Sequence, residues 1–290
     1  MSSFQPHAEA LKPLVWCIWS DRPARAADDA GGIIERMLPQ GVAHIAIRLD
    51  GVSIRVGRDR APTSSVSLGS SLENSLGSAV LGGPRQSPYF KHLPVRGPSV
   101  GVQLAPGALP SLTGIDATEF AEQHIRLDDI WPRHLVQSLC DTLVSARGTN
   151  GHRAAIEAFL LERLREGSDV DFTPIIRANL SPVGIGGRSR SVAELVLASG
   201  LSHRHFNRRF RQAIGLGPKS FLRVRRLNAV LEYIARNPQA TGAAVAATFG
   251  FADQAHLNRD FAALTGLAPS DYRRRNPPAI YHVPDGLDPP

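Results

Sequence analysis

The feature that most constrains the fold of this chain is a pattern that occurs twice between residues 191 and 275. The first copy, residues 191–221, is SVAELVLASGLSHRHFNRRFRQAIGLGPKSF, and the second, residues 242–272, is GAAVAATFGFADQAHLNRDFAALTGLAPSDY. Phe210 recurs as Phe261 at an offset of 51 residues, whereas Gly200 recurs as Gly250 at an offset of 50. Repetition at a fixed spacing predicts that one supersecondary unit is used twice, with one more residue in the second turn.

Each copy predicts a helix, a short turn and a second helix. Gly200 can adopt the positive φ that ends the first helix, and Ser202 and Asp253 are suited to cap the second helix of each copy. Apolar residues at helical spacing predict its buried face: Phe206, Phe210, Ala213 and Ile214 in the first copy, and Leu257, Phe261 and Leu264 in the second. The opposite face is basic, which is typical of the DNA-binding helix-turn-helix motif.

Two helical hairpins from an ordinary helical bundle are the alternative, but the basic face lies in the same place in both copies, which favours the DNA-binding interpretation. The stretches GLSHRHFNRRFRQAIGLGPKSFLRVRRL and GFADQAHLNRDFAALTGLAPSDYRR resemble the two signature motifs of the AraC/XylS family of bacterial transcription regulators. The resemblance covers about the last third of the chain. It implies a seven-helix domain with two recognition helices, and sequence-specific regulation of transcription.

The resemblance also implies which side chains read DNA. The positions that reach base edges are occupied by Arg204, Asn207 and Arg208 in the first motif and by Gln254, Asn258 and Arg259 in the second. Arg211, on the basic face of the first motif, is also expected to bind DNA. Arg can bond to two guanine acceptors, and Asn or Gln to adenine. Ala255 departs from the polar residue that is usual at its position. Further arginines are expected to contact phosphates or to be solvated: Arg188, Arg190, Arg223, Arg225 and Arg226.

The distribution of charge divides the chain. Residues 181–276 hold 15 Lys/Arg and 5 Asp/Glu, a balance of +10, whereas residues 1–180 are almost neutral with 18 and 19. A basic domain beside a neutral one predicts a polyanionic partner. We therefore expect a regulatory domain and a DNA-binding domain. A fragment of residues 182–276 should fold and bind DNA without the rest of the chain. The expected boundaries are 1–168 for the N-terminal domain, 169–276 for the DNA-binding domain and 277–290 for a tail.

The N-terminal part predicts an α+β protein: a β-rich domain with trailing helices, followed by the all-α domain with two helix-turn-helix motifs. Residues 1–12 read as loose, and short strands are expected at 13–20, 42–49, 52–56, 77–81, 89–92 and 99–104. Asp50-Gly51 predicts a hairpin between the second and third of these. Helices are expected at 117–124, 132–147, 151–165 and 173–180. Their apolar stripes could contact a second subunit or close the open face of the strand domain.

Two further stretches, ERMLPQGVAHIAI and GVQLAPGALPSLTGIDATEFAEQHIRLDDIW, resemble the β-rich effector-type domain of one branch of the same family. This resemblance implies a cupin-like barrel that is regulated by a ligand or a partner. The expected partners are therefore double-stranded DNA, a small-molecule effector, a second copy of the chain and, for an activator, RNA polymerase.

The sequence contains no pattern that predicts catalysis, a metal or a cofactor. The histidines that could bind a metal are scattered: His44, His92, His124, His134 and His152. A signal peptide and an apolar run of about 20 residues are both lacking, so we expect a cytoplasmic protein that does not enter a membrane. Cys17 and Cys140 are expected to be reduced thiols. The alternative functions are an enzyme with a DNA-binding appendage and a non-specific nucleic-acid-binding protein.

Overall fold

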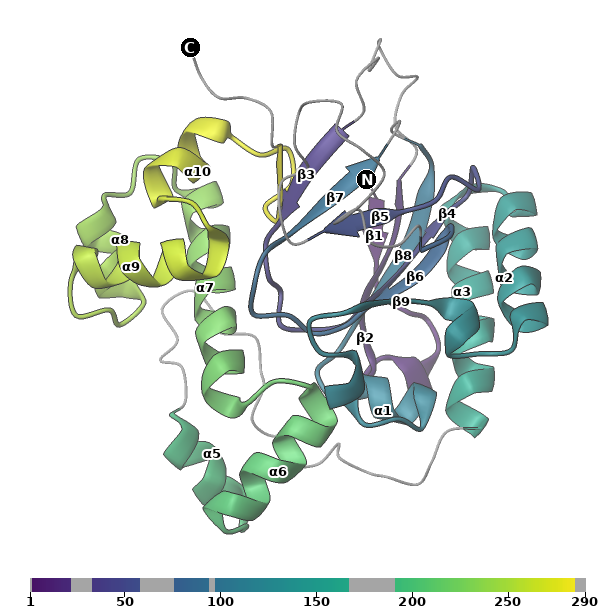
Figure 1. Ribbon diagram of the computed structural model, residues 1–290, viewed down its shortest axis with the longest axis horizontal. Helices are drawn as coiled ribbons and strands as arrows, with labels where there is room; N and C mark the ends of the chain where they lie inside the picture. Colours follow the sequence, from purple (N-terminus) through teal and green to yellow (C-terminus); the bar gives the residue numbers. More distant parts are fainter. Residues whose placement is uncertain (1, 22–32, 58–75, 94–96, 167–190, 285–290) are drawn as a thin grey trace, which may run out of the picture.

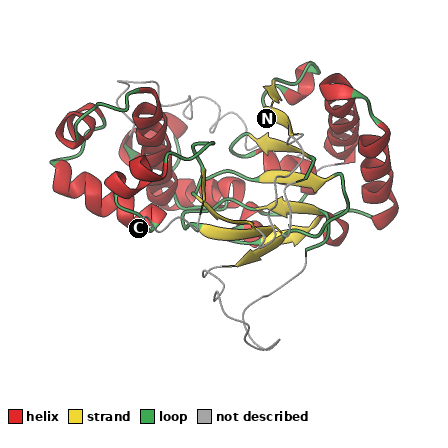
Figure 2. Ribbon diagram, turned by 90° about the horizontal axis from the view of Figure 1, so that it is seen from above, coloured by secondary structure: helices red, strands yellow, loops and turns green. Residues whose placement is uncertain are grey.

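The computed structural model describes residues 2–21, 33–57, 76–93, 97–166 and 191–284. Two antiparallel sheets form the centre of the molecule (Figure 1). Helices of the C-terminal half lie on one side of these sheets, and two long helices that follow the strands lie on the other (Figure 2). The protein is therefore of the α+β class that the sequence predicts.

The larger sheet has six strands in the order β1-β2-β8-β4-β6-β9. These are β1 (Ser2–Phe4), β2 (Val15–Asp21), β4 (His44–Arg48), β6 (Ala79–Gly82), β8 (Ser99–Leu104) and β9 (His124–Arg126). Alternation along the strands gives the sheet two different faces. On β4, Ile45 and Ile47 belong to the main apolar cluster of the N-terminal half, whereas His44 and Ala46 point to the opposite face.

The smaller sheet has four strands in the order β10-β3-β7-β5. These are β3 (Ile33–Met37), β5 (Arg55–Gly57), β7 (Tyr89–Leu93) and β10 (His282–Pro284). In the register of β10 and β3, Val283 lies opposite Arg36 and His282 lies opposite Met37. A strand that follows the second repeated motif thus completes a sheet that is otherwise made by residues 33–93.

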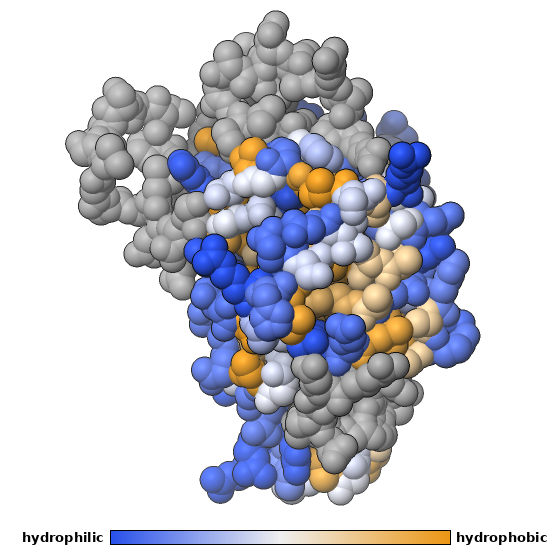
Figure 3. All heavy atoms as spheres, turned by 90° about the vertical axis from the view of Figure 1, so that its right-hand side faces the viewer, coloured by the Kyte–Doolittle hydropathy of each residue, from blue (hydrophilic) through white to orange (hydrophobic). Residues whose placement is uncertain are grey.

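Three helices pack on the apolar face of the larger sheet: α1 (Ala108–Thr113), α2 (Arg133–Ser145) and α3 (Gly148–Glu166). Leu139 and Leu143 of α2 and Ile156 and Leu160 of α3 belong to the same buried cluster as Ile45. The apolar stripes therefore close the open face of the strand domain, one of the two alternatives that the sequence leaves. The outward side of these helices is largely hydrophilic, with smaller hydrophobic areas (Figure 3).

Six helices of the C-terminal half are described: α5 (Val192–Ser199), α6 (His203–Ile214), α7 (Pro218–Arg236), α8 (Gly242–Thr248), α9 (Gln254–Thr265) and α10 (Pro269–Arg275). The two repeated units are α5–α6 and α8–α9, which we call the first and second motif, and α7 joins them (Figure 1). No helix of the described ranges is long and apolar enough to cross a membrane.

Several local expectations are wrong. Gly51 does have a positive φ, but β4 and β5 belong to different sheets, because β4 pairs with β6 and β8 instead of forming a hairpin. Residues 117–124 form a short 3-10 helix (Ala117–Phe120) before β9, rather than one α-helix. Residues 1–12 are not loose, because β1 pairs with β2 and Leu11 is fully buried. The helix expected at 173–180 lies outside the described residues.

Candidate nucleic-acid interface

The two motifs begin their second helices in the same way. The side chain of Ser202 accepts a hydrogen bond from the amide of His205 at the start of α6, and that of Asp253 accepts one from the amide of His256 at the start of α9. Gly200 and Gly250 both have positive φ, and one more residue separates the glycine from the cap in the second motif. The caps and the longer second turn are as the sequence predicts.

The outward face of α6 carries exposed arginines. Arg204, Arg208 and Arg211 are exposed, whereas Phe206 and Phe210 are buried on the other side. Asn207 is held by its own helix, because its side-chain amide donates to the carbonyl of His203 at 2.8 Å and lies 2.9 Å from the His203 ring. The arginines are therefore more available to a groove than Asn207 is.

The outward face of α9 is polar and less basic. Gln254, Asn258 and Arg259 are exposed, as is Ala255. The Gln254 side chain lies against Gly242 at the start of α8, where an added Cβ would come within 2.6 Å of its amide carbon. The exposed polar groups on α9 are thus fewer and more constrained than the arginines of α6.

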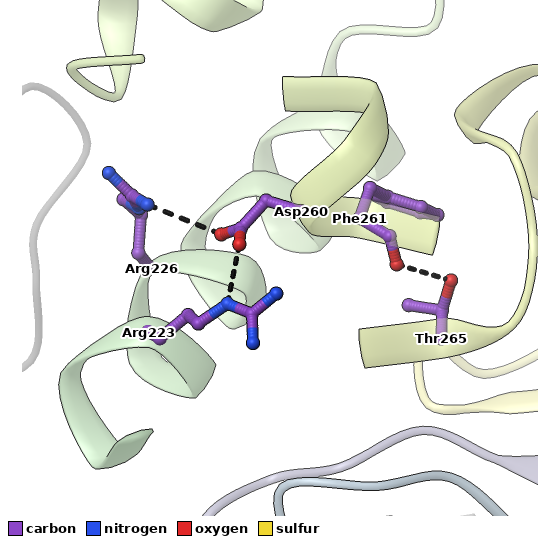
Figure 4. A network of polar contacts seen from close by, with 5 residues as sticks. All are labelled: Arg223, Arg226, Asp260, Phe261 and Thr265. Carbon is purple, nitrogen blue, oxygen red and sulfur yellow. Dashed lines mark hydrogen bonds and ion pairs between the residues drawn. The ribbon is translucent and has the colours of Figure 1, made fainter. Parts of the chain in front are cut away.

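Two of the arginines expected at phosphates are engaged within the domain. Arg223 of α7 forms an ion pair with Asp260 of α9, and Arg226 contacts the second carboxylate oxygen of Asp260 at 3.2 Å (Figure 4). Asp260 is only 12% exposed, so this contact fixes α9 on α7. Sequence reasoning missed Asp260, although it replaces Arg209 of the first motif, and that reversal of charge at equivalent positions indicates a partner of opposite sign.

The other arginines expected to contact phosphates are Arg225, Arg188 and Arg190. Arg225 faces the N-terminal half, where its guanidinium lies 4.7 Å from the centre of the Trp16 ring, and burial lowers its pKa. A phosphate contact does not fit this arrangement, because the Arg225 guanidinium is partly buried against Trp16. The sequence alone does not show which side of α7 the N-terminal half covers. Arg188 and Arg190 lie outside the described residues.

Both motifs are attached to the N-terminal half at the C-terminal ends of their second helices. Gly215, which follows α6, lies against Pro84 and the carbonyl of Ala117. Arg36 of β3 donates to the carbonyls of Thr265 and Gly266 at the end of α9, at 3.3 and 3.5 Å. The attachments leave the N-terminal halves of α6 and α9 uncovered, and these halves carry all the candidate reading residues except Arg211, which lies in the last turn of α6.

A second group of polar side chains lies between the two sheets. The His44 and His124 ring centres are 5.8 Å apart, and Tyr89 lies 4.5 Å from His124. Burial lowers the pKa of His44 to about 4 and that of His124 well below its usual value, so both imidazoles are neutral near pH 7. Among the described residues, no group of three or more His, Cys, Asp or Glu is arranged to hold a metal.

This polar group extends to β10. The Glu35 carboxylate lies 2.8 Å from Lys91 Nζ and 3.3 Å from His282 Nδ1. Burial alone would raise the pKa of Glu35, but its contacts with His282 and Lys91 outweigh burial and hold that pKa below its usual range. The sequence does not predict that His44 and Glu35 belong to one polar group, since nothing in their local patterns shows that β4 and β3 lie in facing sheets.

Comparisons with known proteins match two separate stretches of the chain. Residues 195–275 match the model of a "Helix-turn-helix domain" family, and residues 2–126 match a "Domain of unknown function (DUF6597)". The HTH-type transcriptional regulator Rv1931c of Mycobacterium tuberculosis is 32% identical over 114 residues, which span 37% of this chain and 43% of that protein. The chain thus matches less than half of that relative.

Solved structures of ToxT from Vibrio cholerae are also similar. One, at 1.65 Å resolution, has 11% sequence identity and a TM-score of 0.43, and the match covers 89% of this chain and 96% of ToxT. Another, described as bound to an unsaturated fatty acid, has 12% identity and a TM-score of 0.44 over 88% of this chain and 93% of ToxT.

The sequence match and the structure of the C-terminal half therefore lead to the same assignment. The matched residues 195–275 contain both motifs and the helix α7 between them. The resemblance that the two signature motifs carry is confirmed for this part of the chain, because residues 195–275 match the helix-turn-helix domain family.

Proposed function

We propose that this protein is a sequence-specific transcription regulator that inserts α6 and α9 into successive major grooves of one DNA duplex. The observation that carries the proposal is that both second helices are capped alike and expose polar side chains able to bond base edges in their N-terminal halves. Arg204 and Arg208 suit guanine, and Gln254 and Asn258 suit adenine. Arg211 and Arg259 complete the proposed reading surface.

The length of α7 supports binding to one face of DNA. Its 19 residues span about 28 Å at ~1.5 Å per residue. Successive major grooves on one side of a duplex are roughly 34 Å apart. The remaining difference is small enough to be met by the diagonal placement of the recognition helices or by bending of the DNA.

Selection of duplexes from a random library by the full chain, followed by footprinting, tests this function. We expect an enriched sequence with two protected segments on one face of the duplex. A specificity ratio near one over random DNA at physiological salt would reject the proposal in favour of a non-specific nucleic-acid-binding protein.

The polar group between the sheets supports regulation through the N-terminal half. Two neutral imidazoles, the Tyr89 hydroxyl and the ion pair of Glu35 with Lys91 offer both donors and acceptors away from bulk water. We propose that a small polar effector binds to this group. A second copy of the chain and RNA polymerase are the further partners that we propose, because the family resemblance implies them.

One contact favours the alternative that the protein is an enzyme, but the burial of the two residues in that contact argues against catalysis there. Ser20 Oγ lies 2.9 Å from His152 Nδ1, as in a nucleophile and its general base. However, Ser20 is 6% exposed and His152 is fully buried, so a substrate cannot reach them. The contact instead ties α3 to β2.

A further inference from the structure

One short segment of the N-terminal half touches both DNA-binding motifs. Residues 38–42, with the sequence LPQGV, connect β3 to β4 and are called the spacer segment here. Leu38, at 2% exposure, belongs to the buried cluster of the second motif with Leu257 and Phe261. Val42, four residues later, belongs to the buried cluster of the first motif with Phe206 and Phe210.

Between these two anchors the spacer segment follows α7. The side-chain amide of Asn228 donates to the carbonyl of Gln40 at 3.0 Å, and Asn228 is only 2% exposed. Gly41 has a φ of +74°, and a Cβ there would lie 3.2 Å from Val224 Cγ1. Glycine is thus the residue that permits both the left-handed backbone and the close approach to α7.

The spacer segment is also tied to the N-terminal sheets. The amide of Leu38 donates to the carbonyl of Tyr281 at 2.9 Å, just before β10. The Gln103 side chain on β8 donates to the side chain of Gln40. The distance between Leu38 and Val42 is therefore set by the sheets and not by the motifs themselves.

The two motifs have separate buried clusters. If α7 were their only connection, the angle between the motifs would change whenever that helix bends. We propose that the spacer segment is a positioning element that sets the separation and angle of α6 and α9, and with them the half-site spacing that the protein accepts. This inference rests on the proposed function. It makes Leu38, Val42 and Asn228 positioning residues for DNA recognition, although none of them touches DNA.

The test uses the full chain and the duplex that the wild-type protein selects from a random library. One or two base pairs are inserted between the two protected segments, and affinity is compared with that for the unmodified duplex. Asn228→Asp places a carboxylate against the Gln40 carbonyl. We expect it to reduce the discrimination between spacings by about tenfold, which corresponds to ~1.4 kcal/mol, while affinity for a duplex with one half-site stays unchanged.

Asn237→Asp is the matched control. It makes the same substitution directly after the same helix, where the side-chain amide of Asn237 donates at 3.0 Å to the carbonyl of Tyr233 in the last turn of α7, away from the spacer segment. We expect it to keep the wild-type discrimination between spacings. Val42→Ala, which weakens the anchor in the first motif, is the second variant if Asn228→Asp does not fold, and the same loss of discrimination is expected.

The outcomes separate the two proposals. If the wild-type protein selects no duplex, the proposed function fails. If the wild-type protein discriminates between spacings and folded Asn228→Asp and Val42→Ala discriminate equally well, the spacer inference is overturned while the proposed function stands. A purely structural role would lower single-half-site affinity and spacing discrimination together, which would also overturn the inference.

Discussion

The two helix-turn-helix motifs share a backbone plan but differ in how they are held and in what they expose. The first motif presents four exposed arginines, and the N-terminal half adds Val42 and Trp16 to its apolar cluster, while α1 and the 3-10 helix Ala117–Phe120 pack against α6. The second motif presents one exposed arginine, and its cluster includes both Leu38 and Val283. The comparison indicates that the first motif offers more positive charge to DNA, whereas the apolar cluster of the second motif is completed by β10, a strand that pairs with β3 of the N-terminal half.

The largest expected effect comes from removing the N-terminal half. Residues 182–276 lose Leu38, Val42 and Val283, and burial of one such side chain is worth about 1.5–3 kcal/mol. We therefore expect the isolated segment to be several kcal/mol less stable than the same residues within the full chain, with a loss of protection in both α6 and α9. Hydrogen exchange of the segment and of the full chain measures this, and unchanged protection in both helices would contradict it.

A charge introduced at β10 should affect mainly the second motif. Val283 is fully buried between the sheet and the C-terminal helices. Val283→Asp is expected to cost about 3 kcal/mol, because an unpaired carboxylate would be buried there. Chemical denaturation measures the loss, and protease cleavage near α9 should appear before cleavage near α6.

Val144→Asp is the control for that substitution. Val144 of α2 is 61% exposed, so the same change should cost under ~1 kcal/mol. A similar loss in both variants would mean that the burial of Val283 is not what holds the second motif.

DNA reading should show the opposite asymmetry. Arg208→Ala and Arg259→Ala occupy equivalent positions of α6 and α9 and should each cost ~1–3 kcal/mol on the selected duplex. We expect the larger loss of specificity from Arg208→Ala, because Ala255 leaves the second motif fewer groups that read bases. Affinities on selected and scrambled duplexes at two salt concentrations measure it. Equal losses on both duplexes would show that these arginines contact the backbone instead.

Acidification should loosen the second motif through the N-terminal half. His44 has a folded pKa of about 4, below the unfolded value of about 6.5, so the unfolded state binds the proton first as pH falls. Stability is then lost between about pH 6.5 and pH 4, by on the order of 3 kcal/mol. Glu35, whose pKa is held low, stays charged in this window and does not contribute to the slope.

Thermal unfolding of wild type and His44→Gln across this range measures the slope, which the variant should flatten. We also expect α9 to lose hydrogen-exchange protection at a higher pH than α6, because His282 on β10 adjoins the same polar group. An unchanged slope in the variant would assign the pH dependence to other groups.

The smallest expected effect concerns the ion pairs that Asp260 of the second motif forms with α7. Asp260→Asn should cost about 1 kcal/mol, since Arg223 and Arg226 are partly exposed and solvent screens part of the interaction. Asp271→Asn, which removes a more exposed pair with Arg274, should cost a few tenths. Thermal melts of both variants measure the difference, and equal shifts would mean that the contact with α7 does not stabilise α9.

Local patterns predict the repeated motifs well because their helices, caps and turns are set by residues close in sequence, as with Ser202 and Asp253. They also predict most individual strands. They do not predict which strands pair, since pairing joins distant segments: Asp50-Gly51 reads as a hairpin, yet β4 and β5 lie in different sheets. For the same reason the side chains of Leu38, Val42 and Asp260 gain their roles only from the tertiary arrangement.

The pairing of β10 with β3 has a consequence for synthesis of the chain on the ribosome. His282 contacts Glu35 across 247 residues, so one edge of β3 has no partner strand until β10 has been translated. At about 5–20 residues per second, that interval is on the order of 10 to 50 s. During it, the nascent polypeptide carries an open strand edge of the kind that pairs with other chains. The chain is thus most prone to aggregate through β3 during its synthesis, before β10 covers that edge.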